Sequence, residues 1–123
     1  MPVKVIDASA LAAILFNEPD AGRVVAAISD DGLVAPQLIW FEIASVCLKK
    51  MRAHARRRDA FLGALQLMER LDIELAAVDL PDAITLAENS GLTVYDACYL
   101  WLARLLKCEL VTLDRRLDAA FRR

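Results

Sequence analysis

Short apolar runs alternate with longer amphipathic stretches along this chain. The continuous, largely β-branched or aliphatic runs predict buried strands over 3–7, 33–35, 73–78 and 110–112. Between them, apolar residues recur every three to four positions, which predicts helices over 8–16, 20–29, 37 into the 50s, 58–71, 79–91, 94–107 and from about 115. Strands separated by helices favour a parallel sheet covered on both faces. We therefore expect an α/β fold with three layers, α/β/α, around a mostly parallel sheet.

Turn and cap residues mark the boundaries of these elements. Asp20 and Asp79 precede helical patterns and are predicted to cap them, Pro81 suits the first helical turn, and Gly91 suits a helix end. Asp30-Asp31-Gly32 predicts a turn before the second strand. No linker, repeat or low-complexity segment interrupts the pattern, so we expect one domain over residues 1–123.

Composition narrows the class of protein. With 58% hydrophobic residues in 123, the chain is large and apolar enough to bury a core. Cys47, Cys98 and Cys108 show no CxxC spacing and fall in apolar stretches, so we interpret them as reduced core residues. We find no signal peptide and no apolar run of the ~20 residues that cross a membrane, so we expect a cytoplasmic protein with no membrane partner. The net charge of −2 neither requires nor excludes nucleic acid.

Four carboxylates stand where the pattern calls for apolar residues. Asp7 ends the first strand, Glu42 interrupts an apolar helical run, Asp96 lies inside the run 94–102, and Asp114 follows the last strand. Burying an unpaired carboxylate costs several kcal/mol of free energy. In parallel sheets, ligands bind beyond the carboxyl ends of the strands, and this topology directs the four acids to that edge. A shared divalent cation is the simplest common explanation.

Oxygen-only ligands indicate the metal and the chemistry. Mg²⁺ and Mn²⁺ prefer carboxylates and water, whereas zinc sites use His and Cys. Such an ion activates water and stabilises charge on a phosphate, so the acids predict phosphodiester hydrolysis. Each acid also has a structural explanation: Asp7 and Asp114 as helix caps, and Asp96 as an acid at the positive end of a helix. Glu42 has the weakest such explanation, since a glutamate in mid-helix gains no cap.

Neighbouring polar residues are candidates for support. Ser9 and Thr112 are hydroxyl residues two positions from Asp7 and Asp114, able to hydrogen-bond a carboxylate or a water. The alternatives are a helix N-cap for Ser9 and a residue of high strand propensity for Thr112. Arg115 and Arg116 are candidates for contact with a scissile phosphate.

Two further features have ordinary structural interpretations. The stretch 49–58 holds six Lys or Arg and no acid, and we slightly favour a solvated helix end over a nucleic-acid contact or a contact with an acidic protein. Tyr95, Tyr99 and Trp101 are at helical spacing, which favours core positions over base stacking. We interpret Trp40, next to Phe41, in the same way.

Four segments together resemble the PIN-domain family, specifically the VapC-type toxins of bacterial toxin–antitoxin pairs. They are Val5-Ile6-Asp7-Ala8-Ser9-Ala10-Leu11, Ala35-Pro36 followed by Glu42, Leu92-Thr93-Val94-Tyr95-Asp96-Ala97, and Leu110-Val111-Thr112-Leu113-Asp114-Arg115-Arg116-Leu117. Their order and spacing match over nearly the whole chain.

The resemblance implies an endoribonuclease that requires Mg²⁺ or Mn²⁺. By that resemblance, Asp7, Glu42, Asp96 and Asp114 would ligate metal and position water, with Thr112 supporting the last acid. It also implies an RNA substrate, a homodimer, and an antitoxin protein that inserts its tail into the active-site groove.

The sequence departs from the family pattern in two places. Ser45 and Val46 stand where members often carry an Asn one turn after the helix glutamate, and residues 121–123 leave no room for the further edge strand that members commonly have. We therefore expect a PIN-like sheet of four or five strands.

Two other classes compete with the nuclease. A phospho-receiver domain has similar length and acids at strand ends, but it would need an acid pair after the first strand and a Lys after the last. A catalytically silent PIN-like binding module would share the fold, although the complete set of four acids argues against it.

Overall fold

The computed structural model describes residues 2–123, and its centre is a parallel sheet. Within these residues the sheet has four strands in the order β3-β2-β1-β4. They are β1 (Val3–Ile6), β2 (Gly32–Pro36), β3 (Ile73–Ala76) and β4 (Leu110–Val111). The register places Val5 opposite both Val34 and Leu110, and Leu33 opposite Ile73. All three pairings are parallel, as predicted.

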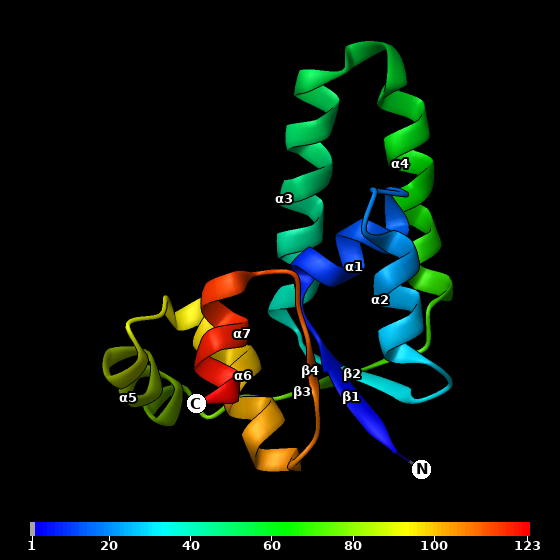
Figure 1. Cartoon of the computed structure of the whole chain (residues 1–123). Helices are drawn as coiled ribbons and strands as arrows, with labels where there is room; N and C mark the ends of the chain where they lie inside the picture. The colour runs from blue at the N-terminus through cyan, green and yellow to red at the C-terminus, as the bar shows by residue number, and fades with distance from the viewer. Residues whose placement is uncertain (1) are drawn as a thin grey trace.

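Helices cover both faces of this sheet. They are α1 (Ala8–Leu15), α2 (Ala21–Ile28), α3 (Leu38–Ala53), α4 (Arg58–Leu67), α5 (Leu80–Ser90), α6 (Val94–Leu106) and α7 (Arg115–Arg122). Figure 1 shows α1 and α2 on one side of the strands and α5 to α7 on the other. The predicted three-layer α/β/α fold with a mostly parallel sheet is confirmed.

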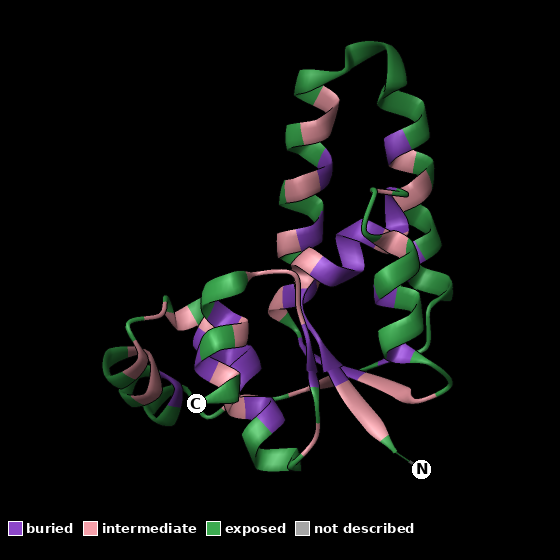
Figure 2. Cartoon of the chain, in the orientation of Figure 1, coloured by how far each residue is buried: buried purple, intermediate pink, exposed green. Residues whose placement is uncertain are grey.

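The core lies between the sheet and these two layers, as the buried ribbon segments in Figure 2 show. Ile6, Leu11, Ile39, Ile43 and Leu100 are at most 1% exposed. Strands that are buried on both faces read as continuous apolar runs, which is why the pattern of short runs located them. The three cysteines are free thiols; Cys108 is only half-buried.

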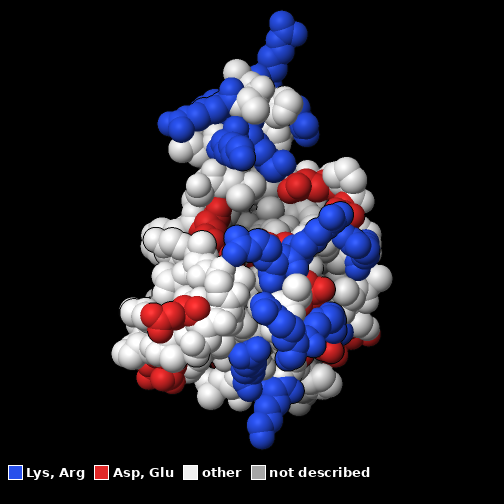
Figure 3. All heavy atoms as spheres, turned by 60° about the vertical axis from the view of Figure 1, so that its left-hand side comes forward, with Lys and Arg blue, Asp and Glu red and all other residues white. Residues whose placement is uncertain are grey.

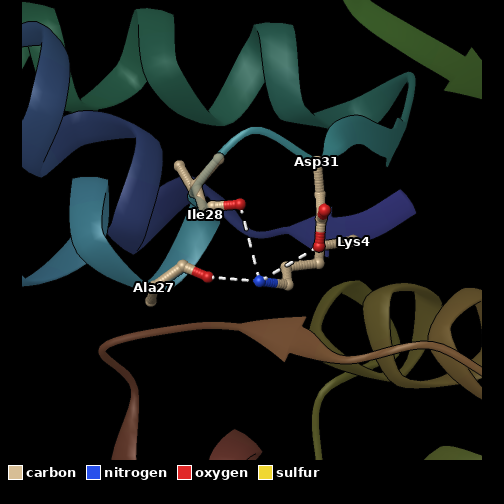
Figure 4. A network of polar contacts seen from close by, with 4 residues as sticks. All are labelled: Lys4, Ala27, Ile28 and Asp31. Carbon is tan, nitrogen blue, oxygen red and sulfur yellow. Dashed lines mark hydrogen bonds and ion pairs between the residues drawn. The ribbon is translucent and has the colours of Figure 1, made fainter. Parts of the chain in front are cut away.

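A half-buried lysine connects α2 to the sheet. The Lys4 ammonium, at the outer side of β1, donates to the Ala27 carbonyl at 2.6 Å and lies 3.2 Å from Asp31 Oδ2 (Figure 4). The Ile28 carbonyl lies 3.5 Å away. A cation at this end of α2 complements the negative pole of the helix and its unpaired carbonyls.

The pair α3 and α4 forms a hairpin that projects beyond the rest of the molecule (Figure 1). A 3₁₀ turn over Ala55–Arg57 joins the two helices at the far end. The 16 residues of α3 span about 24 Å at about 1.5 Å per residue. One end of α3 therefore meets the sheet, and the other stands well away from it.

Several boundaries differ from the sequence prediction. The third strand ends at Ala76 instead of 78, β4 has only Leu110 and Val111, and the helix predicted over 58–71 becomes α4 followed by a 3₁₀ turn over Met68–Arg70. Asp20 was expected to cap α2, but its side chain makes no cap hydrogen bond and pairs with Arg23 at 3.3 Å. Asp79 does cap α5, and Gly91 ends it in the left-handed region with φ 67°.

The strand order also excludes one competing class. Doubly wound receiver domains have the order 2-1-3-4-5. The order found here, β3-β2-β1-β4, is different, so the phospho-receiver alternative is wrong. The described helices include none with the length and apolar character needed to cross a membrane.

Candidate active site

The four predicted acids come from four different elements. Asp7 directly follows β1, and Asp114 lies three residues after β4. Glu42 lies in the second turn of α3, which starts just after β2. Asp96 lies in the first turn of α6. Because parallel strands end at the same edge of a sheet, the fold brings Asp7, Asp114 and the start of α3 to one place.

Asp7 is the one charged side chain among residues 2–123 that is buried, at 4% exposure. Its Oδ1 accepts hydrogen bonds from the Ser9 hydroxyl at 2.7 Å and the Ala10 N–H at 3.0 Å. Its Oδ2 accepts one from the Thr112 hydroxyl at 2.5 Å. A carboxylate has about four acceptor positions, so Oδ2 keeps one for another ligand. The cap interpretation of Asp7 is therefore correct, and capping through Oδ1 does not use the remaining acceptor position of Oδ2.

The two hydroxyls join the ends of β1 and β4. The Ser9 oxygen accepts the Leu113 N–H at 2.9 Å, and the Thr112 oxygen accepts the Asp114 N–H at 3.0 Å. Each hydroxyl donates to Asp7 and accepts from the segment that carries Asp114. Ser9 lies inside α1 while Asp7 occupies the cap position, so the alternative of Ser9 as the N-cap is wrong.

Glu42 is held by a tyrosine that sequence reasoning placed in the core without a polar role. The Tyr99 hydroxyl donates to Glu42 Oε1 at 2.6 Å, and the ring is 1% exposed. Burial and the neighbouring Glu42 raise the pKa of Tyr99 far above its usual range, so this hydroxyl is a permanent donor. The sequence signal for this role was spacing: Tyr99 follows Asp96 by three residues on α6, so the two side chains lie on the same side of the helix. Tyr95, also expected in the core, is 61% exposed, so that assignment is wrong, whereas Trp40 and Trp101 are partly buried and pack against the core.

Asp96 and Asp114 both stand at helix N-termini. Asp114 Oδ1 caps α7 by accepting the N–H groups of Arg116 at 2.9 Å and Leu117 at 3.0 Å. The Asp96 N–H donates to the Thr93 hydroxyl at 3.1 Å, so Thr93 is the cap of α6. The Asp96 carboxylate is therefore not needed to begin its helix.

The four acids lie close enough for their charges to influence one another. Burial is the main cause that raises the pKa values of Asp7, Glu42 and Asp96. The charge of Asp114 raises the pKa of Asp7 and of Asp96, and the charges of Asp96 and Asp7 raise the pKa of Glu42. Hydrogen bonds from Thr112, Tyr99 and Thr93 act in the opposite direction. The site thus concentrates negative charge that its own hydrogen bonds only partly offset.

The donor set fits a hard divalent cation, since it offers carboxylate oxygens and hydroxyls without His or Cys. Within residues 2–123, no three His, Cys, Asp or Glu side chains are arranged to hold one ion between them. Mg²⁺ usually binds through one or two carboxylates and keeps its waters and substrate phosphates as further ligands. The arrangement therefore suits an ion that binds with its substrate better than one caged by protein alone.

The two candidate arginines face different surroundings. Arg116 is close enough to Asp96 that its charge lowers the pKa of that carboxyl, and its guanidinium donates to the Gly91 carbonyl at 2.5 Å. Arg115 instead lines a groove of about 630 Å³ between α2, β4 and α7. That groove contains none of the four acids. Arg116 is thus the one beside the acidic site.

Comparison with known proteins agrees with this fold. The model of the PIN domain matches residues 4–121. Ribonuclease VapC3 of Pyrobaculum aerophilum is 34% identical over 122 residues, which are 95% of this chain and 93% of that protein. Ribonuclease VapC9 of Mycobacterium tuberculosis is 40% identical over 117 residues, covering 93% and 87%. The crystal structure of PAE2754 from Pyrobaculum aerophilum superposes with a TM-score of 0.77 at 27% identity, covering 97% of this chain and 84% of that one. This chain belongs to the PIN-domain family and is of the VapC type.

Proposed function

We propose that this protein is a metal-dependent endoribonuclease, the toxin of a toxin–antitoxin pair, which hydrolyses RNA phosphodiester bonds with Mg²⁺ or Mn²⁺. The observation that carries the proposal is the mutual electrostatic coupling of Asp7, Glu42, Asp96 and Asp114 at one edge of the sheet. Three of these acids have raised pKa values, so the ionised site is short of positive charge. The ribonuclease names of the relatives support the same activity.

The residues around the site hold the acids in place for this chemistry. Ser9 and Thr112 fix both oxygens of Asp7, and Tyr99 fixes Glu42 Oε1. A divalent ion, when bound, would activate water and stabilise charge on the scissile phosphate. Asp7, Glu42, Asp96 and Asp114 would hold it, each offering oxygen ligands from a separately anchored element. Arg116 is the better placed of the two arginines for a phosphate oxygen, since it already lies beside Asp96.

The site also suits inhibition by an antitoxin. Mutually repelling carboxylates, one buried and three partly buried, are a strong binding site for a guanidinium, which pairs with carboxylates bidentately. An antitoxin that presents an Arg would neutralise the same acids that a metal requires. Because a cellular RNA substrate and an antitoxin would both be found in the cytoplasm, we propose that the protein acts there.

We also expect a homodimer. Large apolar side chains are exposed on α3 and α5, where Phe41, Leu48 and Ile84 are 77%, 44% and 59% exposed. Large apolar side chains exposed to solvent favour association with another apolar surface. Light scattering on the purified protein should give twice the chain mass.

The test is cleavage of total cellular RNA by the purified protein with Mg²⁺ or Mn²⁺. We expect discrete fragments that are absent with EDTA and absent with Asp7→Asn. Cleavage of equal rate by Asp7→Asn, or in EDTA, would contradict the proposed site. No cleavage together with no heat of Mn²⁺ binding in a titration would favour the silent PIN-like module.

A further inference from the structure

The far end of the α3–α4 hairpin carries a cluster of positive charge, here called the basic tip and defined as residues 49–58. It contains Lys49, Lys50, Arg52, Arg56, Arg57 and Arg58, and no acid. All residues from 52 to 60 are exposed. Figure 3 shows Lys and Arg side chains spreading in several directions from this projecting end, with acidic side chains below it on the body.

Local contacts account for only some of these charges. Lys50 pairs with Glu18 at 3.7 Å, Arg58 with Asp59 at 3.5 Å, and Arg57 lies 4.9 Å from the centre of the Phe61 ring. Within residues 2–123, none of the ion pairs or ring contacts includes Lys49, Arg52 or Arg56. These three cations are held out to solvent.

The helix poles do not explain the charge either. Lys50 and Arg52 lie in the last turn of α3, where the negative pole favours cations. Arg56, Arg57 and Arg58 instead lie at the start of α4, where the pole is positive and cations are unfavourable. The interpretation of the whole stretch as a solvated helix end therefore applies to its first half only.

The composition of the basic tip favours a nucleic-acid backbone over a protein partner. The cores of protein interfaces are depleted of charge and depend on large apolar or aromatic anchors. Residues 52–58 offer only alanine, histidine and arginine. Phosphate contacts need exposed positive charge and no apolar anchor, and arginine matches phosphate geometry.

One side of α3 leads from the acidic site to the basic tip. Ser45, Lys49 and Arg52 follow Glu42 at steps of three, four and three residues, so they lie along one stripe of the helix, and all three are exposed. From Glu42 to Ala53 the helix rises about 17 Å at about 1.5 Å per residue. A stacked strand with about 3.4 Å per phosphate covers that distance with roughly five nucleotides.

We propose that the basic tip binds the phosphate backbone of the RNA substrate about five nucleotides away from the bond that is cleaved. The inference rests on the proposed nuclease function, because the RNA it describes is the substrate held at the acids. The contact is electrostatic and independent of base sequence. It gives the enzyme affinity for long RNA that short oligonucleotides do not share.

Binding in EDTA tests the basic tip without any cleavage. The probes are fluorescent single-stranded RNAs of about 20 and about four nucleotides, chosen to exceed and to fall short of the span, titrated at several KCl concentrations. The test variant is Arg52→Gln/Arg56→Gln, which removes two cations without ion pairs. The matched control, Arg23→Gln/Arg70→Gln, removes two exposed cations from other parts of the molecule.

Each lost phosphate contact should lower the log–log salt slope by about 0.7 for single strands. The slope of the test variant should therefore be smaller in magnitude than that of the wild type by about 1.4. If the two proteins bind equally at about 1 M salt, this difference makes the variant about 25-fold weaker at about 0.1 M. The control and the short RNA should show no such loss. Arg52→Lys/Arg56→Lys should bind nearly as the wild type, since charge is what the contact needs.

Three results would overturn the proposal. One is a test variant with the slope of the control, and another is an equal loss with the short RNA. The third is a test variant that binds RNA as the control does but binds polyglutamate, added as a competitor, more weakly than the wild type does. That result would assign the basic tip to an acidic protein partner. Cleavage with Mn²⁺ by the same preparation is measured separately. A protein that binds through the basic tip but does not cut would contradict the nuclease and not the tip.

Discussion

The two ends of α3 carry opposite charge, and different forces hold them. At the sheet end, Glu42 is half-buried, bonded to Tyr99 and surrounded by other acids. At the far end, Arg52 on α3 and Arg56 in the adjoining 3₁₀ turn are exposed and have no acid partner within residues 2–123. Charge at the sheet end costs stability because burial weakens its hydration, whereas charge at the far end stays hydrated.

This difference indicates where a substitution can change function without changing the stability of the fold. Substitutions at the sheet end change packing, hydrogen bonds and chemistry together. Substitutions at the far end change binding with little effect on the folded state, because exposed charges contribute little to stability. The following predictions test that contrast, in order of expected effect.

The largest effect should come from Asp96→Asn. Asp96 is held on α6 while Thr93 provides the cap, so the amide should preserve the helix and remove a charge from the site. Loss of a group that only orients a metal ligand typically costs about 10- to 100-fold, so loss of a ligand should cost about 100-fold or more in cleavage rate. Asp118→Asn, on α7 and paired with Arg122, is the matched control and should cut normally. Equal rates for Asp96→Asn and wild type would remove Asp96 from the site.

The basic tip should affect binding and not the chemical step. With long RNA below saturation, Arg52→Gln/Arg56→Gln should reduce kcat/KM by about 25-fold, which is the expected loss of binding affinity. At saturating RNA, kcat should stay unchanged, because the contact is equal in ground and transition states. Steady-state kinetics over a range of RNA concentrations separates the two terms. A fall in kcat with unchanged KM would contradict a purely electrostatic contact.

Thr112→Val should weaken the acidic end through its support. Valine has nearly the same shape but loses the hydroxyl that donates to Asp7 and accepts the Asp114 N–H. We expect about a tenfold loss of cleavage and a loss of about 1–3 kcal/mol in the free energy of unfolding. Urea unfolding and cleavage rates give both numbers. Thr85→Val, which removes an exposed hydroxyl bonded to the Pro81 carbonyl, should change neither by more than a small fraction of this.

The smallest effect is a gain of stability in Glu42→Gln. Burial raises the pKa of Glu42 in the folded state, so the folded state binds the proton more tightly than the unfolded chain does. That advantage exists at low pH and is lost as pH rises through the ordinary glutamate range and then the raised pKa. The Gln variant, whose Oε1 still accepts from Tyr99, should therefore melt a few degrees higher than wild type at neutral pH without metal.

Changing the pH and adding metal test whether the charge of Glu42 causes this difference in Tm. The difference in Tm should shrink toward acidic pH, where Glu42 is protonated, and Mn²⁺ should raise the Tm of wild type more than that of Glu42→Gln. A difference that is constant with pH would mean that charge is not its cause.

Much of this molecule could be predicted from local pattern. Continuous apolar runs located all four strands, and Asp7, Asp79, Asp114 and Gly91 stand at helix ends as their chemistry requires. The four acids stood out because an acid inside an apolar run is unfavourable without a partner. Their convergence followed from parallel topology alone.

What could not be predicted depends on contacts between distant segments. Tyr99 was recognised as a core residue, but its bond to Glu42 joins α6 to α3 across 57 residues. Tyr95 and Phe41 have the same apolar character as core residues, and only the packing of α3 and α6 leaves them exposed. The length of β4 and the break after Leu67 likewise reflect tertiary packing, which overrides local propensity at element ends.

The brevity of β4 has a consequence for motion at the site. With only two residues in the ladder, the segment that carries Asp114 is held beyond Val111 by side chains: the Leu113 amide donates to Ser9 and the Asp114 amide to Thr112. Amide protons exchange with solvent when their hydrogen bonds open. These two amides therefore act as an intrinsic exchange reporter, which can record the opening and closing of the acidic site in the protein without a label or a substrate.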